Sequence, residues 1–169
     1  MKATILIVDD ESSIREALCK VLRAEGHEVL SAISGEEAIE KFATGKIDLL
    51  LLDLGLPVKE GWATLAWLDW VNPLLPIMII TGRSNQSKLA EKAGAAALME
   101  KPLDVPCLLR TVAELLSEPM EKKVQRALHR NSRFKYVPNT SNLFEQTLLR
   151  QLNTPYPYPK MEENPSLRS

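Results

Sequence analysis

The stretch ILIVDD at residues 5–10 joins four consecutive apolar residues directly to two carboxylates. A run this short and this apolar predicts a strand that is buried on both faces, as in a parallel sheet covered by helices. Three later segments repeat the arrangement: LLLLD at 49–53, IMIIT at 77–81 and AAALMEK at 95–101. Because parallel strands end at a common edge, we expect the polar residues that close these runs to share one crevice.

Segments with helical periodicity separate the apolar runs along residues 1–118. The expected strands are 4–8, 28–32, 48–52, 77–81 and 96–99. The expected helices are 12–25, 34–42, a third that begins at Gly61, 86–93, and a fifth that Asp104 caps and that continues to about 116. Strict alternation of strand and helix predicts an α/β fold, a (βα)5 doubly wound five-stranded parallel sheet.

The charge of the chain changes near residue 118. Residues 1–118 contain 12 Lys and Arg against 18 Asp and Glu, whereas residues 119–169 contain 9 against 4. With 169 residues the chain is too short for two ordinary domains. We therefore expect one acidic domain over 1–118 and a basic, Pro-rich C-terminal tail over 119–169 that is partly helical or disordered.

The tail has the pattern of a basic helix at 120–129, one apolar helical stripe at 143–152 and a Pro-rich end at 154–169. Its basic residues follow no helix-turn-helix pattern, and it has too few aromatic residues for a base-stacking platform. This argues against a nucleic-acid partner and favours a solvated tail, a tail that binds a protein, or one that folds back onto its own acidic domain. The apolar run at the amino terminus is too short for a signal peptide or a membrane span, so we expect a cytoplasmic protein with no membrane partner.

The carboxylates at the strand ends predict a divalent metal site. Crowded carboxylates repel one another unless a cation or a shared proton relieves them, although any one of them could simply cap a helix or end a strand. Mg²⁺ prefers oxygen ligands and keeps several waters, which suits Asp10 and Asp53 as direct ligands and Asp9 through a water. The sequence contains no cluster of His or Cys that would instead suit zinc or iron.

The remaining strand-end residues suit phosphoryl transfer. The ammonium of Lys101 can neutralise one phosphoryl oxygen, and the hydroxyl of Thr81 can donate to another. Asp53 is the best placed nucleophile, because a carboxylate can attack phosphorus and form an aspartyl phosphate. Pro102 follows the lysine, and a cis peptide bond before it would turn the chain and aim the ammonium inward.

Four motifs in residues 1–118 resemble the receiver domains of bacterial two-component response regulators. They are VDDE at 8–11, LDLGLP at 52–57, TG at 81–82 and KPL at 101–103. Each motif is weak alone, but together, in this order and at these separations, they are specific. The resemblance implies a flavodoxin-like receiver fold.

The resemblance also implies a role for each site residue. Asp53 would be the phospho-acceptor for a sensor histidine kinase, and Asp9, Asp10 and the backbone carbonyl of Gly55 would hold Mg²⁺ with it. Thr81 would engage the phosphoryl group, and the bond from Lys101 to Pro102 would be cis. Phosphorylation would change the binding of a downstream protein effector, or of a second copy through the helix at 86–93, the strand at 96–99 and the helix at 104–116.

The chain departs from the family pattern at three positions. Leu98 stands at the switch position, three residues before the lysine, where receivers often carry an aromatic residue whose rotation accompanies phosphorylation. Gly55 and Arg83 occupy positions that in the family tune how long the phosphoryl group survives. Gly55 has no side chain to shield that group, whereas Arg83 is long enough to do so.

Two alternatives stay open at this point. A Mg²⁺-dependent aspartyl-phosphate phosphatase of the haloacid dehalogenase type would use similar chemistry, but it would need a second Asp two residues after the nucleophile, where Gly55 stands. A phosphorylation-independent interaction module would keep the fold only. The presence of all the acidic residues, Thr81 and Lys101 argues against it, whereas the unusual Leu98 and tail keep it open. On the leading hypothesis the protein is a signalling domain and not an enzyme, beyond catalysing its own phosphorylation and phosphoryl loss.

Overall fold

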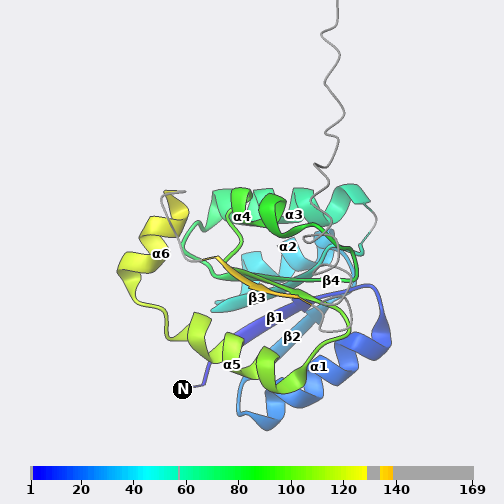
Figure 1. Cartoon of the computed structure of the whole chain (residues 1–169). Helices are drawn as coiled ribbons and strands as arrows, with labels where there is room; N and C mark the ends of the chain where they lie inside the picture. The colour runs from blue at the N-terminus through cyan, green and yellow to red at the C-terminus, as the bar shows by residue number, and fades with distance from the viewer. Residues whose placement is uncertain (1, 57, 129–133, 139–169) are drawn as a thin grey trace, which may run out of the picture. The chain divides into compact units, whose positions relative to one another are not determined.

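The computed structural model describes residues 2–56, 58–128 and 134–138, without the side chains of 58–60. Within this part of the chain the strands form one six-stranded sheet in the order β2-β1-β3-β4-β5-β6, and all neighbouring strands are parallel (Figure 1). The strands are β1 Thr4–Val8, β2 Glu28–Ala32, β3 Leu49–Asp53, β4 Ile77–Thr81, β5 Ala97–Glu100 and β6 Lys135–Val137.

Helices cover both faces of the sheet. They are α1 Ser12–Ala24, α2 Gly35–Thr44, α3 Val58–Val71, α4 Ser87–Lys92, α5 Val105–Leu116 and α6 Met120–Ala127. Figure 1 shows α2, α3 and α4 on one face and α1 and α5 on the other. The predicted doubly wound parallel α/β fold is therefore confirmed.

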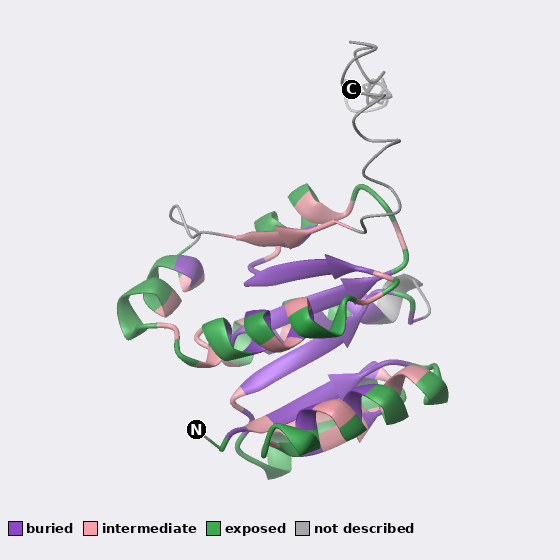
Figure 2. Ribbon diagram, turned by 60° about the horizontal axis from the view of Figure 1, so that its bottom comes forward, coloured by how far each residue is buried: buried purple, intermediate pink, exposed green. Residues whose placement is uncertain are grey.

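Two hydrophobic cores lie on the two faces of the sheet. Along β1, Leu6 and Val8 pack into the core under α2, α3 and α4, whereas Ile5 and Ile7 pack into the core under α1 and α5. All four side chains are at most 1% exposed, and full burial of one such side chain contributes about 1.5 to 3 kcal/mol. Figure 2 shows that the central strands are buried and that the helices on either side of them carry exposed residues. Burial on both faces explains why these strands are continuous apolar runs.

The third helix begins three residues earlier than the sequence predicted, at Val58 and not at Gly61. Gly61 has a different role, because a Cβ there would lie 3.3 Å from the carbonyl oxygen of Asp53. The absent side chain therefore allows α3 to pack closely against the end of β3. The fifth helix begins as expected, with the backbone N–H of Cys107 donating to Asp104 Oδ1 at 2.7 Å.

The predicted number of five strands was one too few. Lys135–Val137 forms β6, which pairs in parallel with β5 and places Tyr136 opposite Leu98. Three residues in a basic segment are too short to show a strand period, so the strand depends on contacts with β5 that the local sequence does not encode. The chain divides into the units Met1–Asn139 and Thr140–Ser169, and β6 belongs to the first.

The tail matches the sequence prediction in one respect, because α6 covers most of the basic helix expected at 120–129. The expected apolar stripe at 143–152 and the Pro-rich end at 154–169 lie outside the described residues. In the part of the chain that the structure describes, no helix has the length and apolar character needed to cross a bilayer.

Candidate functional site

The carboxyl ends of β1, β3 and β5 bring Asp9, Asp53 and Lys101 into direct contact. Lys101 Nζ lies 2.7 Å from Asp53 Oδ2 and 3.0 Å from Asp9 Oδ2. Both carboxylates are buried, at 5% and 1% exposure, while the lysine side chain is 20% exposed. One ammonium therefore binds two buried acids that lie 44 residues apart in the chain.

The carboxylate of Asp53 is fixed from two sides. The backbone N–H of Gly55 donates to Oδ1 at 2.6 Å, and Lys101 holds Oδ2. A Cβ on Gly55 would lie only 2.8 Å from Asp53 Oδ2, closer than real Cβ contacts allow. Glycine at this position thus permits the observed orientation of Asp53.

Three carboxylates could hold a cation at this edge. One oxygen each from Asp9, Asp10 and Asp53 lie within 4.8 Å of one another, and Asp10 is exposed to solvent. An all-oxygen donor set with one ligand open to water fits Mg²⁺, which retains waters and commonly binds only one or two protein carboxylates. The residues present therefore fit the metal that the sequence predicted.

Asp9 carries the clearest electrostatic cost in the site. Burial raises the pKa of Asp9 above its usual value, although the N–H of Glu11 at 2.8 Å from Oδ1 and the Lys101 ammonium both oppose this. Burial alone would lower the pKa of Lys101, but its hydrogen bonds to Asp53 and Asp9 outweigh burial and raise it. The lysine therefore stays charged at neutral pH, while burial keeps the pKa of Asp9 above its usual value.

We expect Asp9→Asn to gain stability relative to the wild type as the pH rises from about 4 to 7 in a metal-free buffer. The folded state binds the Asp9 proton more tightly than the unfolded state does, so ionising this group costs folding free energy above pH 3.8. Urea unfolding at several pH values measures the difference between the two proteins. Glu16→Gln, an exposed substitution on α1, is the control. A difference between Asp9→Asn and the wild type that does not vary with pH would contradict the expectation.

Thr81 ends β4 beside this cluster and is fully buried. Its hydroxyl oxygen accepts from the backbone N–H of Arg83 at 3.0 Å. Its carbonyl accepts from the N–H of Lys101 at 2.8 Å, and its register partner on β5 is Glu100. The threonine is thus joined through the backbone to the strand end that carries the lysine.

The other predicted residues lie around β5. The peptide bond between Lys101 and Pro102 is cis, and Leu98 is fully buried in the core under α2, α3 and α4. The sequence interpretation missed Glu100 and Tyr136, whose side chains are joined by a hydrogen bond of 2.7 Å. A glutamate at the end of an apolar run was the signal available for the first, but its partner lies 36 residues further along the chain.

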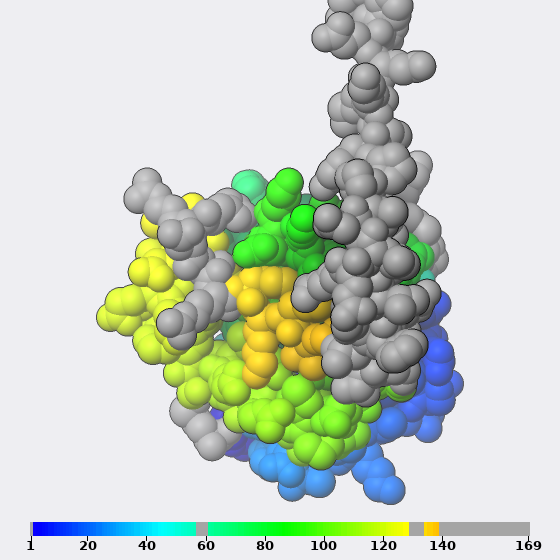
Figure 3. All heavy atoms as spheres, viewed as in Figure 1, coloured from blue at the N-terminus to red at the C-terminus, as the bar shows by residue number. Residues whose placement is uncertain are grey.

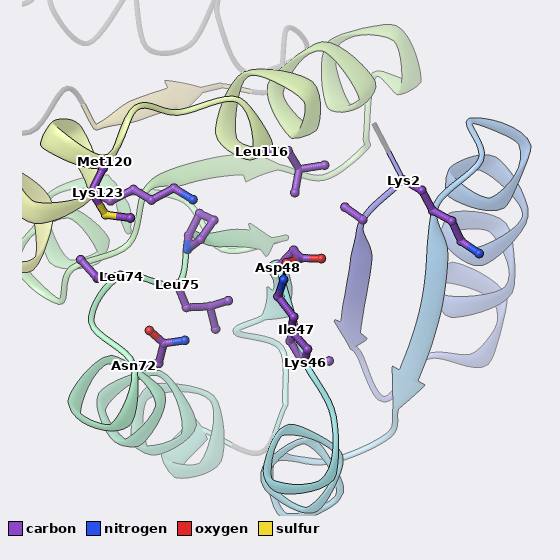
Figure 4. Close-up of a pocket in the computed structure, with 12 residues that line it drawn as sticks. Lys2, Lys46, Ile47, Asp48, Asn72, Leu74, Leu75, Leu116, Met120 and Lys123 are labelled. Atoms are coloured by element: carbon purple, nitrogen blue, oxygen red, sulfur yellow. Dashed lines mark ion pairs between the residues drawn. The ribbon is translucent and has the colours of Figure 1, made fainter.

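A separate pocket lies at the opposite edge of the sheet. It has a volume of about 370 Å³ (Figure 4). Its lining includes Ala3, Asp48 and Pro76, the residues that directly precede β1, β3 and β4, together with Leu116 of α5 and Lys123 of α6. None of the strand-end residues described above lines it. The acidic site is therefore distinct from this pocket.

The sequence matches the family model of the response regulator receiver domain over residues 5–113. The transcriptional regulatory protein ZraR of Salmonella typhimurium is 36% identical over 122 residues, which cover 71% of this chain and 28% of that protein. The DNA-binding transcriptional regulator NtrC of Escherichia coli is 30% identical over 132 residues, or 77% of this chain and 28% of NtrC. The chain thus spans little more than a quarter of the length of these curated relatives.

Solved structures give the same result for the fold. A CheY-like receiver domain protein from Methanospirillum hungatei is 29% identical, with a TM-score of 0.66, over 74% of this chain and 98% of its own. A response regulator described as putative, from Chloroflexus aurantiacus, is 32% identical, also with a TM-score of 0.66, over 70% of this chain and all of its own. Both similarities cover nearly all of the matched structure and about seven tenths of this chain.

Proposed function

Because the chain belongs to the response regulator receiver domain family, a family of signalling domains in two-component systems, we propose that Asp53 accepts a phosphoryl group from a sensor histidine kinase. The observation that carries this proposal is the position of Asp53. Its carboxylate is held by the Gly55 N–H and the Lys101 ammonium and lies within 4.8 Å of two further carboxylates. A carboxylate fixed in this way is aimed as a nucleophile.

Transfer forms a bond between an oxygen of Asp53 and phosphorus and breaks the bond between phosphorus and the histidine nitrogen of the kinase. The histidine leaves with a proton from water. Lys101, which already contacts Asp53 Oδ2, moves to a phosphoryl oxygen, and the hydroxyl of Thr81 turns toward another. These two groups neutralise and orient the charge that arrives at the site.

Asp9, Asp10, Asp53 and the carbonyl of Gly55 would hold Mg²⁺. The metal would supply charge neutralisation for the phosphoryl oxygens as they approach the acids. The support for this assignment is the oxygen donor set and its exposed member, Asp10. Without a metal ion, an incoming phosphoryl group would be repelled by three carboxylates, and only the Lys101 ammonium would offset their charge.

The output of the switch is a change of partner and not turnover of a metabolite. We place the protein in the cytoplasm, with a downstream protein effector and a second copy of the chain as the partners of the α4, β5 and α5 surface. That surface is occupied in part by β6, which pairs with β5. The domain boundary near residue 118 stays part of the proposal: the family model ends at residue 113, whereas the sheet continues to β6 at Lys135–Val137. The regulatory activities named for the relatives are not transferred to this chain, which spans 28% of their length.

A small phosphodonor such as acetyl phosphate tests the proposal on the full chain. We expect one phosphoryl group per chain in the presence of Mg²⁺ and almost none with a chelator. Sustained hydrolysis of an aryl phosphate, far beyond one equivalent, would instead support the phosphatase alternative. Failure to label together with failure to bind Mg²⁺ in calorimetry would support the interaction module.

A further inference from the structure

Strand β6 lies between two helices on the edge of the sheet. In Figure 3 the orange atoms of residues 134–138 lie between the green atoms of α4 and the yellow-green atoms of α5. Phe134 and Tyr136 pack against the core under α2, α3 and α4, whereas Val137 packs against the core on the other face. Lys135 also forms an ion pair with Glu114 of α5. The segment is thus held on both faces of the β5 edge.

The most specific contact of β6 is made to a buried acid. The hydroxyl of Tyr136 donates to Glu100 Oε1 at 2.7 Å, and Glu100 is only 3% exposed. Burial of a carboxylate without hydrogen-bond donors is costly, so each donor to it matters more than a donor at the surface would. The tail therefore supplies one of the groups that make Glu100 tolerable inside the domain.

Glu100 is directly joined to the proposed phosphorylation site. It precedes Lys101 in the chain and is the register partner of Thr81, and the N–H of Lys101 donates to the Thr81 carbonyl. The end of β5 is therefore anchored twice. On one side Lys101 binds Asp53 and Asp9, and on the other side Glu100 binds Tyr136.

We infer that β6 is a latch that phosphorylation of Asp53 releases. The structure shows the latch closed while Lys101 binds the free carboxylate of Asp53. A phosphoryl group draws Lys101 and Thr81 toward itself, and the peptide that links Lys101 to Glu100 moves with them. Strand β6 has three residues, and a shift of Glu100 breaks its hydrogen bond with Tyr136, so that β6 leaves the β5 edge.

This inference rests on the proposed function, and one experiment separates the two. Hydrogen exchange of backbone amides is measured by NMR on the full chain with Mg²⁺, before and after addition of beryllofluoride, a mimic of the phosphoryl group. A shift of the Gly55 amide, which contacts Asp53, reports that the mimic has bound. We expect the amides of Lys135 and Val137 to exchange about tenfold faster or more once it has.

Each outcome has a defined meaning. Faster exchange in β6 with a shifted Gly55 amide supports the latch. Unchanged or slower exchange in β6 with a shifted Gly55 amide overturns the latch and leaves the proposed function intact. If the Gly55 amide does not shift at any concentration of the mimic, both the proposed function and the latch are overturned.

A second test uses a conservative variant and the fact that the coupling between two binding equilibria acts in both directions. If binding of the mimic opens the latch, weakening the latch must tighten binding of the mimic. We expect Tyr136→Phe to lower the Kd for beryllofluoride about fivefold. Tyr158→Phe, at a position outside the described residues, is the matched control and is expected to leave the Kd unchanged. An unchanged or weaker affinity in Tyr136→Phe, or an equal effect in both variants, would refute the coupling.

Discussion

Asp53→Asn is expected to abolish labelling of the chain by acetyl phosphate in the presence of Mg²⁺. The amide cannot act as the nucleophile, and it is a poorer ligand for a hard cation than a carboxylate is. The neighbouring Asp9 is not an equivalent replacement, because the Glu11 N–H and Lys101 already bind its carboxylate. We therefore expect a loss of at least about 100-fold in labelling rate.

Asp104→Asn is the matched control for this variant. Asp104 caps α5 through its carboxylate, and asparagine caps helices about as well as aspartate does. The control keeps the fold and the site, and it should label like the wild type. Labelling of Asp53→Asn at a rate comparable with the control would show that another residue accepts the phosphoryl group.

Lys101→Met is expected to lower the free energy of unfolding by about 3 kcal/mol at pH 7 in a metal-free buffer. The substitution leaves the carboxylates of Asp9 and Asp53 buried together without the ammonium that both contact. This expected loss of stability lies at the lower end of the range for breaking a buried ion pair, because the lysine side chain is 20% exposed and water can reach part of the site. Urea unfolding measures the loss.

Two comparisons identify the cause of this loss. Lys88→Met on α4 removes an exposed lysine and should change stability by less than about 0.5 kcal/mol. Addition of Mg²⁺ should restore part of the stability of Lys101→Met, because a cation bound by the acids replaces some of the missing positive charge. A stability loss equal to that of Lys88→Met, or one that Mg²⁺ does not reduce, would contradict the role assigned to Lys101.

The proximity of Lys101, Asp53 and Asp9 follows from the sequence because the apolar runs define parallel strands. Once β1, β3 and β5 are assigned, their carboxyl ends must share one edge, and residues up to 92 positions apart become neighbours. The identity of the side chains then supplies the chemistry. What the sequence could not provide was the double pairing of Lys101, which depends on side-chain orientation.

The contact of Tyr136 with Glu100 could not be predicted in the same way. Lys135–Val137 is too short to have a period, and its basic surroundings suggested a solvated tail. Its position depends on an open strand edge, a buried glutamate and two core faces, all of which exist only after the domain has folded. The sequence alternative in which the tail folds back onto the acidic domain named the domain that β6 binds, but not the hydrogen bond between Tyr136 and Glu100.

The proposed chemistry depends on which residue carries the phosphoryl group. The full chain can be phosphorylated with acetyl phosphate and Mg²⁺ and reduced with borohydride, which converts an aspartyl phosphate to a stable alcohol, and then mapped by mass spectrometry. We predict that the reduced residue is at position 53 and at no other acid. A reduced residue at Asp9 or Asp10, or a stoichiometrically labelled chain with an intact Asp53, would contradict the account.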